Sequence, residues 1–169
     1  MKKTTKLYNL IFPIWFLLFF PPVIFITILG NYVIDSLMIM ICFYVYKLKD
    51  KGFNLKIFYK KNILKVWLYG FLADFIGAGI LFLIILLGDK FKVLNQVVGA
   101  LSYHPFTNPI ASIIIISAVF VSAGFIFLFN YKLVFEKHIK EKALRFKIAM
   151  TIAIITAPWT FFLPADWIY

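Results

Sequence analysis

The sequence contains a long apolar run, Val66 to Gly88, which is interrupted by a single charged residue, Asp74. A run of this length is long enough to cross the hydrocarbon core of a bilayer as a helix. Backbone groups in hydrocarbon must find their hydrogen-bond partners within the same segment, so the run is predicted to be a transmembrane helix. Its acid is then expected to face protein or trapped water rather than lipid.

Small residues accompany Asp74 on one face of this predicted helix. With 100° per residue, that face spans an arc of roughly 100° and also carries Gly70, Ala73 and Gly77. A second set repeats at four-residue steps near the carboxyl end of the chain and consists of Ala149, Ala153 and Ala157. Small side chains let membrane helices approach closely, so both sets are predicted to be helix-packing surfaces.

The composition extends the membrane prediction to the whole chain. Of the 169 residues, 63% are hydrophobic, and the mean hydropathy is +0.94, which is too apolar for a soluble domain. The sequence predicts a single integral membrane domain, residues 1–169, with an all-α fold. We expect a polytopic bundle of about five spans, at 7–29, 32–46, 64–88, 110–131 and 148–163.

The first two of these spans depend on where the chain turns between residues 7 and 46. Pro21-Pro22 removes two backbone donors, whereas Gly30-Asn31 reads as a helix stop followed by a polar turn residue. We favour the turn at Gly30-Asn31 because Tyr32 then lies at a membrane interface, where tyrosine is enriched. On that interpretation the two prolines kink the first helix.

The basic residues predict the orientation. Of the 18 Lys and Arg residues, three precede residue 7, seven lie within 47–65 and six lie within 132–147, which leaves Lys90 and Lys92. Cytoplasmic loops carry such an excess, so the amino terminus is predicted to be cytoplasmic and the carboxyl terminus extracytoplasmic. The net charge of +11 therefore indicates membrane orientation, and the sequence has no separate basic domain that would predict a nucleic-acid partner.

The sequence offers no recognisable catalytic or metal-binding motif. The predicted topology puts His104 and His138 on opposite faces of the membrane, so they are not expected to share a metal or a catalytic triad. Cys42 is the only cysteine, which excludes an internal disulfide. We therefore predict no enzyme activity, no catalytic residue, no metal site and no cofactor.

The candidate polar site within the membrane consists of Asp74, Asp35, Asn31 and Asn130. Either acid could bind a cation or proton, or could form a hydrogen bond to a neighbouring helix. With a turn at Gly30-Asn31, Asp35 lies about 6 Å below the turn while Asp74 lies about 20 Å from the outer end of its span. The acids would then act independently. A turn at Pro22 would instead place both acids at about the same depth in the membrane, which would favour a role in ion or proton handling.

Three segments carry a family resemblance: Tyr8-Asn9-Leu10-Ile11-Phe12-Pro13-Ile14-Trp15, Asn31-Tyr32-Val33-Ile34-Asp35-Ser36-Leu37 and Gly70-Phe71-Leu72-Ala73-Asp74. Over most of its length the chain resembles uncharacterised small multi-span membrane proteins of clostridia and related low-GC Gram-positive bacteria. The resemblance implies a location in the plasma membrane and brings no activity with it.

Two functions follow from these patterns. The first is a noncatalytic accessory or interaction subunit, whose small-residue faces pack within the bundle, against another membrane protein or against a second copy. The second is a small transporter component that handles a cation, a proton or a small substrate at Asp74. Transport predicts a water-accessible pocket where Asp74 meets other polar groups, whereas an interaction role predicts no continuous polar cavity and a lipid- or partner-facing groove lined by small residues.

Overall fold

A computed structural model describes residues 14–17, 23–88 and 95–164, and all regular structure in these ranges is helical. This confirms the predicted all-α fold class. The elements in order are α1 (Ile14–Leu17), α2 (Val23–Val45), η1 (Leu48–Lys51), α3 (Leu55–Gly88), α4 (Asn95–Tyr103), η3 (Pro105–Thr107), α5 (Pro109–Phe129), the π-helical η4 (Asn130–Val134), α6 (Lys142–Ile155) and η5 (Trp159–Phe162).

Four segments of the described chain are long and apolar enough to cross a membrane: Val23–Val45, Leu55–Gly88, Pro109–Val134 and Lys142–Phe162. Large apolar side chains cover their outer surfaces, and Ile26 and Phe120 are each 71% exposed. Exposed apolar surface on this scale needs hydrocarbon rather than water around it. The chain is therefore an integral membrane protein with helical spans.

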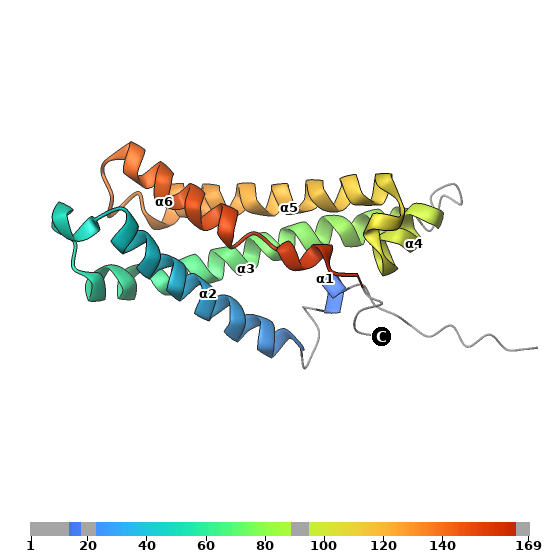
Figure 1. Ribbon diagram of the computed structural model, residues 1–169, viewed down its shortest axis with the longest axis horizontal. Coiled ribbons are helices and arrows are strands. Elements are labelled where there is room, and N and C mark those ends of the chain that lie inside the picture. Colours follow the sequence, from blue (N-terminus) through green and yellow to red (C-terminus); the bar gives the residue numbers. More distant parts are fainter. Residues whose placement is uncertain (1–13, 18–22, 89–94, 165–169) are drawn as a thin grey trace, which may run out of the picture.

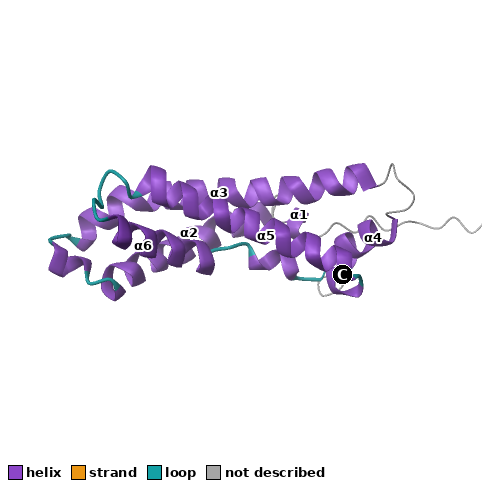
Figure 2. Ribbon diagram, turned by 90° about the horizontal axis from the view of Figure 1, so that it is seen from above, coloured by secondary structure: helices purple, strands orange, loops and turns teal. Residues whose placement is uncertain are grey.

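The helices α3 and α5 form the long axis of the molecule and lie side by side (Figures 1 and 2). The helices α2 and α6 pack against the half of this pair that carries the basic loops, and α1, α4 and η5 lie at the other half. Figure 1 also shows α2 diverging from α3 toward the amino-terminal end of α2.

Local signals explain where the two long helices begin. Asn54 precedes α3, and its side-chain oxygen accepts a hydrogen bond from the Ile57 amide at 3.3 Å. Asn108 precedes α5 and accepts from the Ile110 amide at 2.9 Å, with Pro109 at the first helical position. These contacts satisfy amides that have no carbonyl partner in the first turn of a helix.

The closest approach of α3 to α5 occurs at Gly77. A Cβ atom added there would collide with the Ser122 hydroxyl and would lie 3.3 Å from the Ala118 carbonyl oxygen and 3.2 Å from the Phe161 ring. Only the absence of a side chain allows α5 and η5 to pack against this point of α3. Gly79, two residues further along, has no atom within 4 Å of the equivalent position.

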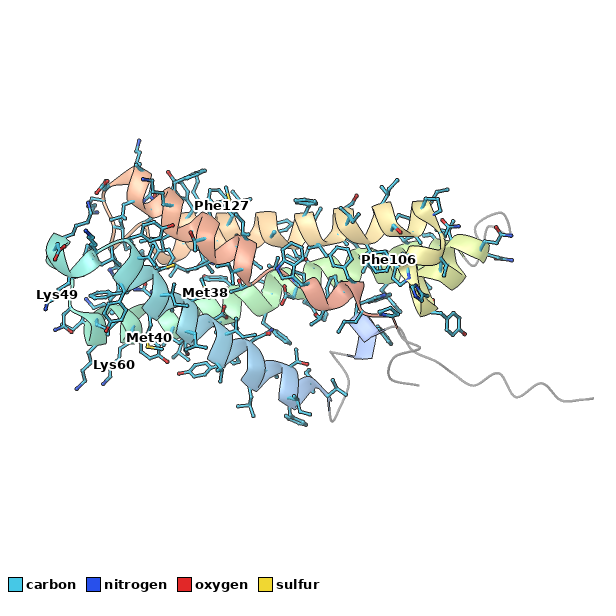
Figure 3. The ribbon with its side chains drawn as sticks, in the orientation of Figure 1. Met38, Met40, Lys49, Lys60, Phe106 and Phe127 are labelled. Carbon is cyan, nitrogen blue, oxygen red and sulfur yellow. The ribbon has the colours of Figure 1, made fainter. Side chains whose placement is uncertain are left out.

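The basic end of the bundle is held by ion pairs and aromatic contacts. Lys51 pairs with Glu141 at 2.7 Å, and this contact links the α2–α3 loop to the start of α6. Arg145 is buried, lies 3.3 Å from Glu136 and stacks over the Tyr131 ring at 4.4 Å. Figure 3 shows the labelled residues Lys49 and Lys60 at this end and Phe106 at the opposite end.

The structure corrects the predicted division of residues 7–46. The helix α2 continues through Gly30-Asn31 without interruption, so the turn predicted there is wrong. Glycine signals a helix stop in water, but in hydrocarbon a break would leave backbone groups without partners, and the helix therefore continues. The rival turn at Pro21-Pro22 lies outside the described residues, as does the predicted cytoplasmic amino terminus.

The remaining predicted spans differ from the observed helices mainly at their ends. The third span begins at Leu55 rather than 64, because α3 extends into the basic region. The fourth matches α5 within a few residues. The last is interrupted, since α6 ends at Ile155 and a separate turn of helix, η5, follows.

Replacement of Gly77 by Leu is expected to destabilise the protein by about 1 to 3 kcal/mol, because the added bulk must displace α5 or η5. Gly79→Leu is the matched control, and it should change the free energy of unfolding much less. Thermal unfolding in detergent measures both effects. Equal destabilisation by the two substitutions would contradict the assigned contact face.

Because the basic residues gather at one end of the bundle, the two ends are predicted to be accessible from opposite sides of the membrane. In a Cys42→Ala background, cysteines introduced at Lys140 and at Asn95 should react with membrane-impermeant reagents from opposite sides of the membrane. By the distribution of basic residues, Lys140 should react only from the cytoplasm. Labelling of both positions from one side would refute the arrangement of spans.

Candidate functional site

A cavity of about 390 Å³ lies between α2, α3 and the segment that joins α6 to η5. We call it the central cavity. Its lining combines carboxyl, amide and hydroxyl groups with apolar walls, and the residues are Val23, Ile26, Thr27, Gly30, Asn31, Ile34, Asp35, Gly70, Phe71, Asp74 and Ile155 to Phe161. Asp74 meets other polar groups in this pocket, which is one of the two features that a transport role predicts.

Two acids face this cavity from neighbouring helices, and we call Asp35 and Asp74 the carboxylate pair. Asp35 is 4% exposed, and the Oδ1 atom of Asp74 is buried without a hydrogen-bond partner. The Asp35 carboxyl lies against Gly70 of α3, since a Cβ atom at Gly70 would lie 3.6 Å from Asp35 Oδ2, an ordinary van der Waals contact. When both acids are charged they repel each other, and among the described residues no cationic side chain lines the cavity.

Two threonine hydroxyl groups of the lining are left as hydrogen-bond acceptors. The Thr27 hydroxyl donates to the Val23 carbonyl at 3.0 Å, and the Thr156 hydroxyl donates to the Ile152 carbonyl at 2.9 Å. Each hydroxyl hydrogen is therefore used within its own helix, which leaves oxygen lone pairs for the cavity. The Trp159 indole likewise donates to the Ile154 carbonyl at 3.1 Å. The lining favours a ligand that donates hydrogen bonds or carries positive charge.

The interruption of the last span adds negative potential to the same place. Pro158 has no amide hydrogen, so it cannot continue α6, and the helix ends with its carbonyl groups beside the cavity. The carboxyl end of a helix carries a partial negative charge. Interrupted helices that line a cavity near the membrane midplane are a recurring way to bind cations with backbone carbonyls.

The structure overturns the predicted difference in depth between the two acids. Asp35 lies on α2 and Asp74 lies on α3, and these two helices are neighbours. Asp35 Oδ2 lies 3.6 Å from the Cβ position of Gly70, about one helical turn before Asp74, and both acids line one cavity. The predicted difference in depth was wrong because it depended on the turn at Gly30-Asn31.

The two candidate asparagines have different surroundings. Asn31 lines the central cavity one helical turn from Asp35. Asn130 does not line it. That residue begins the π-helix η4, is fully buried, and donates to the Ile126 carbonyl at 2.9 Å.

The predicted packing residues are used within the chain. Gly77 and four alanines are buried inside the bundle, namely Ala73, Ala149, Ala153 and Ala157. Gly70 is half-buried beneath Asp35. Gly70 and Ala157, one from each set, also line the central cavity, whereas the other members of both sets are covered within the chain.

The histidines and the cysteine lie apart from the carboxylate pair. His104 is beside Phe106 at one end of the bundle, and His138 is at the basic end, where partial burial and then Lys61, Lys65 and Lys137 lower its pKa. Cys42 is buried in α2. Within the described ranges, no three His, Cys, Asp or Glu side chains are grouped so that they could hold a metal ion.

Sequence reasoning found the two acids and Asn31 but missed most of the cavity wall. Thr27, Trp159 and Phe161 line the cavity although nothing in their local sequence marks them. Pro158 was the one available signal, because a proline within a span indicates an interruption. Comparison with protein-family models, curated proteins and solved structures found no match to the chain.

The shared cavity predicts that substitutions of the two acids are coupled. Asp35→Asn and Asp74→Asn each remove one charge of a repelling pair, so the double variant should differ from the sum of the single variants by about 0.5 to 3 kcal/mol. Asp35→Asn combined with Asp50→Asn is the control, because Asp50 is exposed in η1, and its effects should add. If the effects of the Asp35 and Asp74 substitutions on the free energy of unfolding in detergent are additive, the two acids do not interact as a pair.

Proposed function

We propose that the protein is a cation-handling transport component of a bacterial plasma membrane, in which the carboxylate pair binds a proton or exchanges it for another cation. The observation that carries the proposal is the convergence of Asp35 and Asp74 on one cavity inside the membrane-spanning bundle. The bacterial plasma membrane follows from the family resemblance and from the asymmetry of the basic residues. Catalysis is not part of the proposed role.

Electrostatics supports this role. Two carboxylates in a medium of low dielectric constant repel strongly, and the carboxyl end of α6 adds to the negative potential. One proton shared between the acids, or one cation between them, removes most of that repulsion. The two acids are thus expected to exchange positive charge as a unit.

An accessory role has less support from the arrangement of side chains. Its basis in the sequence was the set of small residues on two helices, and these are covered by neighbouring helices of the same chain, apart from Gly70 and Ala157, which line the central cavity. The carboxylate pair has no evident structural purpose, because neither acid bonds to a described neighbouring helix. Binding of positive charge gives the pair a role that packing does not.

Infrared difference spectroscopy of the purified full-length protein tests the proposal. A step from alkaline to acidic solution should produce the carbonyl stretching band of a protonated carboxylic acid in a dry environment. This band should disappear in the Asp35→Asn/Asp74→Asn double variant and should persist in Asp50→Asn. If the double variant keeps every such band, the carboxylate pair does not bind the proton and the proposal is wrong.

A further inference from the structure

We propose that the central cavity binds an amphipathic organic cation, an ammonium group that carries an apolar body, which reaches the carboxylate pair sideways from the bilayer. The inference rests on the proposed function and specifies its substrate class. It depends on three observations beyond the acids: the apolar walls of the cavity, its lipid-facing rim and the aromatic side chains in its lining.

The walls of the cavity are chiefly hydrocarbon. Apolar side chains come from all three of its sides, and they are Val23, Ile26, Ile34, Phe71, Ile155, Trp159 and Phe161. A hydrated inorganic ion gains nothing from such walls, and Mg²⁺ or Ca²⁺ needs six or more oxygen ligands. An organic cation uses both parts of the cavity, because its apolar body contacts the walls while its charge meets the acids.

The rim of the cavity faces the surrounding hydrocarbon. Ile26 is 71% exposed and Ile34 is 45% exposed on the α2 side, while Trp159 is 52% exposed on the opposite side. These residues lie within spans, so their exposed surfaces contact lipid tails. A ligand that is itself partly apolar can dissolve in the bilayer and reach the cavity past these exposed side chains.

Aromatic side chains line the same cavity as the two acids. Phe71 follows Gly70 on α3, and Trp159 and Phe161 enclose the other side of the cavity. The face of an aromatic ring attracts cations, and quaternary ammonium groups are recognised in this way. Combined with two acids and two acceptor hydroxyl groups, the rings favour an ammonium group over an anionic or neutral ligand.

Gly30 marks the space that the apolar body would fill. It lines the cavity, and a Cβ atom added there would meet no atom within 4 Å. Gly124 is a matched control, because it also has open space around its Cβ position and lies within a span, but it does not line the cavity. Leucine can therefore be introduced at either position without a direct clash at Cβ.

The test measures binding of radiolabelled benzyltrimethylammonium to the purified protein in detergent. Saturable binding that weakens as protons are added is expected, and the loss of at least tenfold in affinity is expected for Asp74→Asn. Neopentylbenzene, which has the same shape without the charge, should compete at least tenfold more weakly than unlabelled probe. Gly30→Leu should weaken binding at least tenfold, while Gly124→Leu should bind as the unmodified protein does.

The outcomes separate this inference from the proposed function. If the infrared band of the carboxylate pair is present but the probe neither binds saturably nor diminishes the band, the organic substrate class is wrong and the proton site stands. If the band is absent and the probe does not bind, both proposals fail. Saturable binding that Gly30→Leu leaves unchanged would overturn the location of the site.

Discussion

The contact of α3 with α5 at Gly77 determines much of the remaining structure. Because the two backbones approach closely there, the Ser122 hydroxyl and the Phe161 ring both pack against α3, and η5 is held over the middle of the bundle. The segment before η5 then lies beside Asp74, where it closes one side of the central cavity. Gly77, which allows this close packing, therefore also positions the carboxyl end of α6 near the carboxylate pair.

The rule that membrane backbones must bond internally explains both the regular and the irregular parts of the bundle. It keeps α2 helical through Gly30-Asn31, although both residues favour a turn in water. It also makes the interruption at Pro158 unusual, because a broken helix leaves carbonyl groups that need a donor or a positive charge. The Trp159 indole satisfies the Ile154 carbonyl, and the adjoining carbonyl end of α6 lies beside the cavity.

The class of fold could be predicted from the sequence because apolar runs and basic loops are local signals. The run that contains Asp74 became α3, and the run after Pro109 became α5. The site was harder to predict because it depends on how deep each acid lies in the membrane. Whether Asp35 meets Asp74 is decided by where α2 begins, and the Gly30-Asn31 signal, which indicates a turn in water, misjudged that position. Thr27 and Trp159 join the site only through tertiary packing.

The energetic cost of the carboxylate pair is the strongest reason to assign it a function. A charged acid at the centre of a span costs about 2.5 to 3.5 kcal/mol, and placing a second acid beside it adds repulsion. The Oδ1 atom of Asp74 is buried without a hydrogen-bond partner, so packing within the described chain does not account for this acid. A proton or an organic cation at the pair removes the repulsion, so the free energy stored there changes whenever positive charge binds or leaves. Such a dependence couples occupancy of the cavity to the fit of α2 against α3, which is the property that a transport component needs.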